Sequence, residues 1–415
     1  MGGEICDQEH RGHELIAYPQ AVEAVLGRAR PVERPFELIP LDRAQGRVLA
    51  HPVAMDRSEP PVPRSAMDGF AARSEDGDAI RTLVGRVFAG TSEIPTLGPG
   101  EAVAVMTGGT VPPGSDVVIP IEHCQVDGNT VRFENTPVAG RHVRLAGEMG
   151  VSGRVLIEPG VRLADSDLAA AAGCGLSSLN VFPRPRAIVI STGDEVIQWE
   201  LNPAAHQVRD SNRLGSALQL QRAGAEVVRH LHVPDDPVAL RGAVESALDD
   251  ADLVVTIGGV SMGEKDFMPI VFEELSVKEL FHGVSIQPGK PVWAGHRENK
   301  WVLGLPGNPI SSFVILEVLG LPLVRKLSGC RGVDSARIPE KGSAGGEARS
   351  KKRERFLPAD LKVNANGTTI VTPRPEHGSG DWTSLAGATA LLHLPPRTQM
   401  QTGQTAFFLR LDSAH

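Results

Sequence analysis

Residues 187–275 alternate strand-like and helix-like segments, and this alternation most limits the folds open to the chain. Short apolar runs at 187–191, 227–233 and 253–256 have the length and β-branched content of buried strands. The segment between the last two runs has an apolar stripe at helical spacing, formed by Leu240, Ala243, Val244, Ala247 and Leu248. Strands that alternate with helices predict a doubly wound, mainly parallel sheet.

Helix start and stop signals support this alternation. Asp236-Pro237 is typical of an N-cap followed by a proline at the first helical position. A further helix is predicted from Asp210-Ser-Asn212 to the stop signal Gly224, and shorter helices are predicted at 269–275 and 310–319.

The first part of the chain is predicted to consist mainly of short strands and turns, in keeping with the high glycine and proline content of the protein. We expect a strand at 101–106 and a hairpin turn at Asp127-Gly128. Two helices are also predicted, one at 18–29 that ends at Arg30-Pro31 and an Ala-rich one at 164–175.

The last part of the chain again has a strand-rich pattern. Residues 356–411 contain short strand-like runs and the turn signal Asn366-Gly367, which predicts a small all-β domain. Residues 339–355, with a Gly-rich stretch and a short basic run, are predicted as a loop or hairpin flank.

Length and composition narrow the class of protein. A chain of 415 residues is too long for one core, so two to four domains are expected. The net charge of −8 argues against a nucleic-acid-coating surface. No apolar run is long enough to span a bilayer, and the four cysteines form no CxxC pair. We therefore expect a cytoplasmic protein without nucleic-acid or membrane partners.

The stretch from Thr256 to Asp266 is the first candidate binding loop. It follows a predicted strand and contains Gly258, Gly259 and Gly263, whose backbone N–H groups are free to curl around an anion. Ser261 adds a hydroxyl donor, while Glu264 and Asp266 add carboxylates, which suit a Mg²⁺ ion bridged to phosphate. The alternative is a Gly-rich turn with solvated charges.

Three other stretches also leave predicted strand ends: Ser191–Glu195, Asp235-Asp236 and Gly304–Pro309. In open α/β sheets, ligands bind outside the carboxyl ends of the parallel strands. All four stretches contain groups suited to phosphate, metal or hydroxyl ligands. Their convergence therefore predicts one shared binding site.

Each of these stretches also has a purely structural interpretation. Asp236 is best explained as an N-cap, which leaves Asp235 as the freer ligand. Asp194-Glu195 is compatible with the start of a helix, and Gly307-Asn308-Pro309 with an ordinary turn as well as an anion site. Lys290, held between Gly289 and Pro291, is more plausibly an anion ligand than a flexible surface lysine.

Two segments before the α/β region place polar side chains on Gly-rich turns. Asp68 follows a Pro-rich approach and precedes Gly69, and Thr107 precedes a Gly-Gly-Thr loop. Ordinary turn chemistry explains both by itself. Neither the P-loop spacing GxxxxGK[ST] nor the dinucleotide-binding spacing GxGxxG occurs in the loops.

Taken together, these motifs resemble those of the molybdenum insertases, the MoeA family that includes the gephyrin E domain. The matching motifs are Ser65-Ala-Met-Asp-Gly-Phe70, Met106-Thr-Gly108, Ser191-Thr-Gly-Asp-Glu195, Asp210-Ser-Asn212, Gly258-Gly-Val-Ser261 with Gly263 and Asp266, Pro288-Gly-Lys-Pro291 and Gly304-Leu-Pro-Gly-Asn-Pro309. They occur in order over residues 18–411, and the ordered set is highly specific.

The resemblance implies an α/β plus β architecture in an elongated homodimer whose partner subunit helps to line the cleft. It implies a discontinuous N-terminal domain at 14–55 and 145–185, with an inserted β-rich domain at 56–144. A MogA-like α/β substrate-binding domain at 186–330 and a small β domain at 336–413 would follow.

The resemblance also implies the chemistry, in which molybdate is inserted into adenylylated molybdopterin with Mg²⁺-dependent loss of AMP. The family active-site positions fall on Asp68, Thr107, Glu195, Asp235 and Asp266, with Glu195, Asp235 and Asp266 as candidate Mg²⁺ ligands. The expected substrate-binding residues are Gly258, Gly259, Val260, Ser261, Gly263, Lys290, Pro306, Gly307, Asn308, Pro309 and Ser379. Candidate protein partners are a molybdopterin adenylyltransferase and molybdoenzymes.

The chain departs from the family pattern at several basic positions. Two family lysines fall on Gly283 and Gln287, and a family arginine falls on Pro358. The loss of each charged hydrogen bond should weaken oxyanion capture by about 1–3 kcal/mol. Candidate replacements are His282, Lys290 and Arg355.

Two alternative functions use the same residues. A related nucleotide-hydrolysing enzyme would need only the strand-end loops, and would act without Asp68 and Thr107. A divergent, non-catalytic paralogue would bind the pterin or act as a scaffold. The missing basic residues favour this second alternative, whereas the retained acidic set argues against it.

Overall fold

The computed structural model describes residues 15–261, 266–333 and 339–411, so Gly263 and Glu264 lie outside the described residues. The chain forms two compact units. Unit 1 comprises the chain up to His51, Pro159–Asp165 and the chain from Ser178 onward. Unit 2 comprises Pro52–Glu158 and Ser166–Ser177. The boundaries of the four expected domains remain a prediction.

A six-stranded sheet forms the centre of unit 1, as the alternation of strands and helices predicted. Its order is β16 (Glu226–Val233), β13 (Arg186–Thr192), β17 (Leu253–Ile257), β21 (Lys300–Leu305), β20 (Trp293–Arg297) and β18 (Lys278–His282). The first four strands are mutually parallel. Strand β20 pairs antiparallel with β21, and β18 pairs antiparallel with β20, so β20 runs opposite to the other five strands of this sheet. The prediction of a mainly parallel sheet is therefore confirmed.

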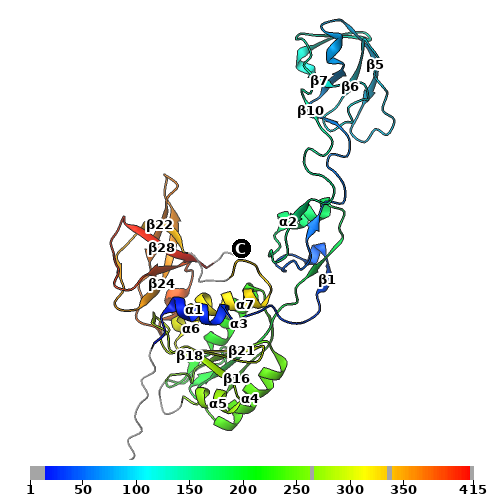
Figure 1. Cartoon of the computed structure of the whole chain (residues 1–415). Coiled ribbons are helices and arrows are strands. Elements are labelled where there is room, and N and C mark those ends of the chain that lie inside the picture. The colour runs from blue at the N-terminus through cyan, green and yellow to red at the C-terminus, as the bar shows by residue number, and fades with distance from the viewer. Residues whose placement is uncertain (1–14, 262–265, 334–338, 412–415) are drawn as a thin grey trace, which may run out of the picture. The chain divides into compact units, whose positions relative to one another are not determined.

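Helices cover both faces of this sheet (Figure 1). One face packs against α1 (Tyr18–Leu26), α3 (Ser211–Ala223), α6 (Pro309–Ile315) and α7 (Leu321–Leu327), and the other against α4 (Pro237–Asp250) and α5 (Met268–Glu274). Successive side chains of β13 alternate between the two cores: Ala187 and Val189 join the first, and Ile188 and Ile190 join the second. A strand buried on both faces explains the continuous apolar run in the sequence.

The helix ends follow the predicted caps. The Asp210 carboxylate accepts a hydrogen bond from the backbone N–H of Arg213 at 3.1 Å, and Gly224 ends α3 with a φ of 110°. Asp236 caps α4 by accepting from the backbone N–H of Ala239 at 2.8 Å. Helix α1 is shorter than predicted, because it ends at Leu26 with Gly27 as its C-cap.

The helix predicted at 310–319 is longer than expected. Helix α6 continues through a π-helical segment, Leu316–Gly320, directly into α7. Pro322 is the second residue of α7 and does not end the helical path; the carbonyl of Val318, four residues earlier, accepts instead from the Tyr18 hydroxyl at 3.5 Å.

The C-terminal part of unit 1 is a second sheet that closes on itself. Its order is β19 (Ile286–Gln287), β24 (Glu354–Val363), β25 (Thr369–Pro373), β22 (Glu340–Ala344), β28 (Thr405–Arg410) and β26 (Ala390–Leu394), with β26 also paired to β24. The all-β prediction is confirmed, and the β24–β25 turn contains Gly367 at a φ of 77°. The prediction of a loop at 339–355 is wrong for β22, whose weak strand propensity is overridden by pairing on both edges.

Unit 2 is built on a six-stranded sheet. Its order is β7 (Val117–Pro120), β4 (Gly69–Ala72), β6 (Glu101–Val105), β5 (Arg81–Val87), β9 (Thr130–Phe133) and β8 (Cys124–Asp127). The predicted hairpin is confirmed as the antiparallel pair β8–β9, and α2 (Asp165–Gly173) is the predicted Ala-rich helix.

Five two-stranded ladders complete the sheets among the described residues. They are β1 (Glu37–Pro40) with β12 (Ser178–Val181), β2 (Val53–Ala54) with β11 (Val155–Ile157), β3 (Arg64–Ser65) with β10 (Val143–Arg144), β14 (Val196–Ile197) with β15 (Val208–Arg209), and β23 (Ala348–Arg349) with β27 (Gln399–Met400).

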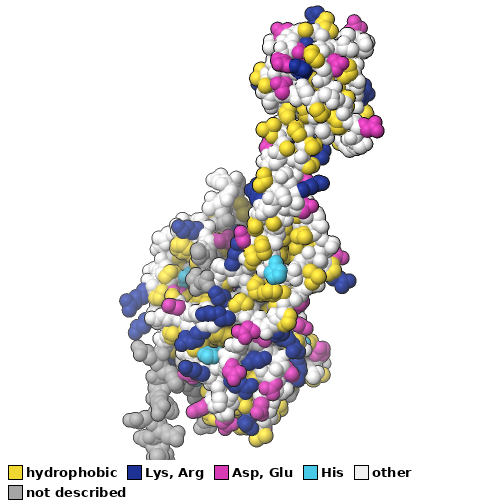
Figure 2. Space-filling model, turned by 45° about the vertical axis from the view of Figure 1, so that its right-hand side comes forward, with side chains coloured by type: hydrophobic (Ala, Val, Ile, Leu, Met, Phe, Trp, Pro, Cys, Tyr) yellow, Lys and Arg dark blue, Asp and Glu magenta, His cyan; other side chains and the backbone are white. Residues whose placement is uncertain are grey.

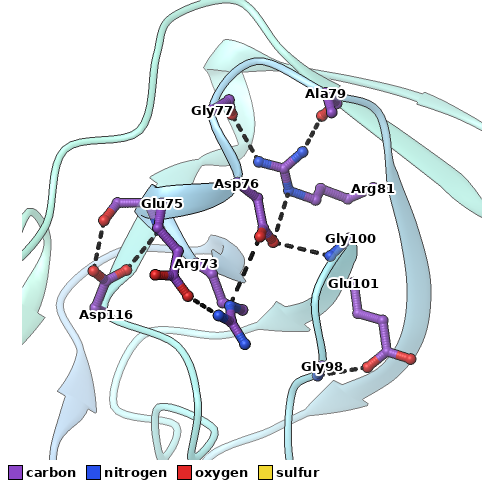
Figure 3. Close-up of polar contacts among 11 residues, drawn as sticks. Arg73, Glu75, Asp76, Gly77, Ala79, Arg81, Gly98, Gly100, Glu101 and Asp116 are labelled. Carbon is purple, nitrogen blue, oxygen red and sulfur yellow. Dashed lines mark hydrogen bonds and ion pairs between the residues drawn. The ribbon is translucent and has the colours of Figure 1, made fainter.

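A buried arginine organises one end of the unit 2 sheet (Figure 3). The side chain of Arg81 is fully buried and donates to the backbone carbonyls of Gly77, at 2.7 Å, and Ala79. Its Nε lies 3.8 Å from the Asp76 carboxylate, which also accepts from the backbone N–H of Gly100 at 2.9 Å. The Asp76 carboxylate thus joins the Arg81 guanidinium and the turn before β5 to the turn before β6.

The surface carries charges of both signs. Figure 2 shows Lys and Arg side chains interspersed with Asp and Glu on the visible face. In the part of the chain that the structure describes, no helix is long and apolar enough to cross a membrane.

Candidate functional site

The four parallel strands of unit 1 end at a cleft of about 1030 Å³. Every one of the four predicted strand-end stretches contributes to its walls. The predicted site residues that line it are Glu195, Asp235, Gly258, Gly259, Val260, Ser261, Asp266, Pro306, Gly307, Asn308 and Pro309. The structure thus brings together the residues that sequence reasoning expected to meet.

The first turn after β17 requires glycine at two successive positions. Gly258 and Gly259 have φ values of 93° and 66°, which non-glycine residues rarely adopt. A Cβ at Gly258 would lie 3.1 Å from the carbonyl oxygen of Thr192, and one at Gly259 would lie 2.9 Å from Cγ of Met268. The turn therefore presents backbone without side chains to the cleft, and the N–H of Gly258 within it donates to the Leu305 carbonyl at 3.0 Å.

Asp235 is held in place by neighbouring groups. Its carboxylate accepts a hydrogen bond from the hydroxyl of Thr192, and its backbone N–H donates to the Asp194 carboxylate at 3.2 Å. The side chain and backbone of Asp235 are therefore both hydrogen-bonded, so Asp235 is more constrained than the sequence suggested. Asp194 and Glu195 do not begin a helix, because a turn leads from them directly into β14.

The carboxylates of the cleft suit a magnesium ion that is shared with a phosphate. Among the described residues, no group of three or more His, Cys, Asp or Glu side chains is close enough to hold a metal alone. Mg²⁺ is usually held by one or two carboxylates together with substrate phosphates and water. Asp235 and Asp266, on opposite sides of the glycine turn in sequence, fit that requirement as hard oxygen ligands.

Ser379, from the C-terminal part of unit 1, contacts the start of α6 at the edge of the cleft. Its hydroxyl accepts a hydrogen bond from the Asn308 side-chain amide at 3.0 Å, and its carbonyl accepts from the backbone N–H of Ile310 at 3.1 Å. On the other side, the Asn212 amide donates to the carbonyl of Gly307 at 2.7 Å. The start of α6 is thus fixed between α3 and the C-terminal sheet.

A second cavity of about 260 Å³ shares Pro291, Pro306 and Asn308 with the cleft. Lys290 and Ser379 line this cavity rather than the larger cleft. Its walls therefore contain the predicted anion ligand Lys290.

Two of the three proposed replacements for the missing basic residues are already engaged. A ring nitrogen of His282 lies 2.8 Å from the carbonyl of Val260, and Arg355 forms an ion pair with Glu376 at 2.5 Å. Arg353, which the sequence did not single out, lines the second cavity beside Lys290.

The three positions at which this chain lacks the basic residue of the family differ from one another in structure. Gly283 has a φ of 98°, and a Cβ there would lie 2.7 Å from the Leu15 side chain, so a lysine would be strained. Pro358 is buried within β24. Gln287 lines the second cavity.

Asp68 and Thr107 meet in unit 2, at adjacent ends of β4 and β6. The Asp68 carboxylate accepts from the backbone N–H of Thr107 at 2.6 Å and from its hydroxyl at 2.8 Å. These bonds, the backbone one first, lower the pKa of Asp68 below its ordinary value. The pair is exposed. The predicted strand-end residues thus come together within unit 1, and Asp68 and Thr107 come together within unit 2.

Replacing Thr107 with valine is expected to raise the pKa of Asp68 part of the way to its ordinary value, because the hydroxyl donor is lost while the backbone donor stays. Because the pKa of the Asp68 carboxyl is depressed, the Asp68–Thr107 interaction contributes fully at pH values above the ordinary carboxyl pKa. It is lost as the pH falls through the depressed pKa. An NMR titration of the carboxyl carbon measures the shift. Thr107→Ser keeps the hydroxyl and should leave the pKa unchanged.

Three family models together match most of the chain. They are the MoeA N-terminal region (domain I and II) at residues 16–175, a probable molybdopterin binding domain at 188–326 and the MoeA C-terminal region (domain IV) at 343–411.

Curated relatives match over most of their length. A molybdopterin molybdenumtransferase of Synechococcus elongatus is 36% identical over 76% of this chain and 81% of the relative. That of Synechocystis sp. is 32% identical over 88% of this chain and 92% of the relative. Molybdopterin molybdenumtransferase 2 of Mycobacterium tuberculosis is 32% identical over 91% and 94%, respectively.

Solved structures agree with this similarity. A molybdopterin biosynthesis MoeA protein from Pyrococcus horikoshii superimposes with a TM-score of 0.76 at 28% identity, covering 95% of this chain and 99% of that one. A second structure under that description gives a TM-score of 0.82 over the same shares, at 24% identity.

Proposed function

Because the chain belongs to the MoeA family of molybdopterin molybdenumtransferases, we propose that it is a molybdenum insertase of molybdenum cofactor biosynthesis. It inserts molybdate into adenylylated molybdopterin with Mg²⁺-dependent release of AMP. The observation that supports this most is the convergence of Glu195, Asp235 and Asp266 with the glycine turn on one cleft.

Within the cleft, the residues have distinct roles. The backbone N–H of Gly259 and the hydroxyl of Ser261 donate hydrogen bonds to phosphate oxygens, whereas the N–H of Gly258 donates to the Leu305 carbonyl at 3.0 Å. Asp235 and Asp266 would hold Mg²⁺ together with substrate phosphate oxygens, and the ion would supply neutralising charge to the pyrophosphate. Glu195, the third predicted ligand, lines the same cleft but forms no three-carboxylate group with them among the described residues. Asp68 and Thr107 act in unit 2, as a positioning carboxylate and a hydroxyl donor.

Molybdate, an oxyanion substrate, suits the second cavity. Lys290 is exposed there and Arg353 is half-buried, and both are cations that pair with oxyanions. The Ser379 hydroxyl and the Gln287 amide add neutral hydrogen-bonding groups. We further propose that the enzyme acts as a cytoplasmic homodimer, and that molybdopterin adenylyltransferase supplies its substrate.

The test is AMP release from adenylylated molybdopterin with Mg²⁺, measured with and without molybdate. Molybdate-dependent release is expected. Release at the same rate without molybdate would identify a nucleotide-hydrolysing enzyme instead. Binding of the adenylylated pterin without any release would identify a pterin-binding or scaffold protein.

A further inference from the structure

A tryptophan of the C-terminal sheet region forms part of the wall of the large cleft. Trp382 begins a short 3-10 helix, Trp382–Leu385, and lines the cleft together with Gly380. Its side chain is 60% exposed, which is unusual for so large an apolar group. The face of an exposed indole on the wall of a cleft is accessible for stacking against a bound ligand.

The loop that holds Trp382 is fixed by the neighbouring aspartate. The Asp381 carboxylate accepts from the backbone N–H groups of His377, at 3.1 Å, and Thr383, at 3.2 Å, and also from the Thr383 hydroxyl. These hydrogen bonds, that of the Thr383 hydroxyl first, lower the pKa of Asp381 to about 2. The Asp381 carboxylate therefore stays ionised and can accept these hydrogen bonds across the physiological pH range.

The same loop is anchored to the α/β sheet. Ser379, three residues before Trp382, accepts hydrogen bonds from both Asn308 and Ile310 at the start of α6. The backbone that carries Trp382 is therefore fixed before any ligand arrives, so binding does not have to order this loop.

The second tryptophan of the cleft, Trp199, differs in its surroundings. The Arg213 guanidinium lies 4.9 Å from its ring centroid, and the His230 ring lies 6.1 Å away. Arg213 is itself fixed by an ion pair with buried Asp210 at 2.7 Å. Within the described part of the chain, no ring or cation contacts Trp382 in this way.

We propose that Trp382 is the stacking platform for a planar nitrogen heterocycle of the substrate, and that it determines how tightly the adenylylated pterin is held. This inference rests on the proposed function. The glycine turn and the carboxylates occupy the strand ends and suit the phosphates. The adenine and the pterin at the two ends of those phosphates are both flat rings that stack on an indole face.

The variants Trp382→Leu and Trp382→Phe test this proposal. Base–aromatic stacking predicts that Trp382→Leu weakens binding of adenylylated molybdopterin by about 5- to 150-fold, and that Trp382→Phe weakens it less. Val363→Ala is the control, because Val363 is also an exposed apolar residue, at 68%, in the same sheet region but does not line the cleft. Dissociation constants are measured by calorimetry, and thermal unfolding checks that each variant folds.

Tryptophan fluorescence provides an independent measurement. Wild-type emission should be quenched when adenylylated molybdopterin binds, and this quenching should be smaller in Trp382→Phe, in which Trp199 is the remaining tryptophan of the cleft wall. Titration with AMP alone and with pterin alone then distinguishes the two rings, because Trp382→Leu weakens only the one that stacks on it.

The outcomes separate this inference from the proposed function. If wild-type protein releases AMP normally and Trp382→Leu binds the substrate as tightly as wild type, the stacking platform is disproved while the insertase stands. If wild-type protein binds no adenylylated molybdopterin, both the insertase and the platform are disproved.

Discussion

Asp235→Asn is expected to lower molybdate-dependent AMP release by about 10²–10³-fold, the loss typical for removing one preorganised electrostatic group from an active site. Asparagine keeps an oxygen that accepts the hydrogen bond of the Thr192 hydroxyl, so the local structure is retained. The negative charge that we assign to Mg²⁺ binding is lost. The variant should also need a higher Mg²⁺ concentration for half-maximal rate, which steady-state assays measure directly.

The neighbouring residue offers a matched control. Asp236 caps α4, and asparagine caps helices about as well as aspartate, so Asp236→Asn should keep wild-type activity. Equal losses in both variants would show that the effect is structural. Wild-type activity in Asp235→Asn would exclude this carboxylate as a ligand or catalytic group.

Arg81→Met is expected to destabilise unit 2 by about 3–5 kcal/mol, because removing one member of a buried charged network leaves its partners unsatisfied. The carbonyls of Gly77 and Ala79 lose their donors, and the Asp76 carboxylate loses its buried cation (Figure 3). Methionine keeps much of the side-chain volume, so the loss measures polar contacts more than a cavity.

Differential scanning calorimetry of the full-length protein should show a transition shifted to lower temperature. Arg86→Met provides the control, because Arg86 lies on the same strand but is exposed, and its loss should change stability by less than about 0.5 kcal/mol. Equal shifts for both variants would contradict a special role for the buried guanidinium.

The location of the cleft could be predicted because parallel strands end at a common edge. Once 187–191, 227–233 and 253–256 were identified as strands, the residues that follow them had to be neighbours. Caps such as Asp210 and Asp236 could be predicted too, because capping depends on three or four consecutive residues. Local and periodic patterns were therefore sufficient for the sheet and its loops.

Contacts between distant segments could not be predicted in this way. Nothing local indicates that Trp382 would reach the strand ends, since its position depends on how the C-terminal sheet packs against α6. In the same way, no sequence pattern shows that Arg355 is paired with Glu376 while Arg353 lines a cavity. Strand β22 was missed because its pairing partners, not its residues, stabilise it.

The two-part division of the chain has a consequence for how the protein is made. Strand β1, at Glu37–Pro40, pairs with β12, at Ser178–Val181, and all of unit 2 is encoded between them. At roughly 5–20 residues per second, a ribosome needs on the order of 10 s to synthesise the intervening chain. During that delay β1 has an unpaired edge, whereas every strand of the unit 2 sheet has already emerged. Unit 2 is therefore expected to fold first on the ribosome, and nascent chains stalled before β12 should be the form that chaperones bind.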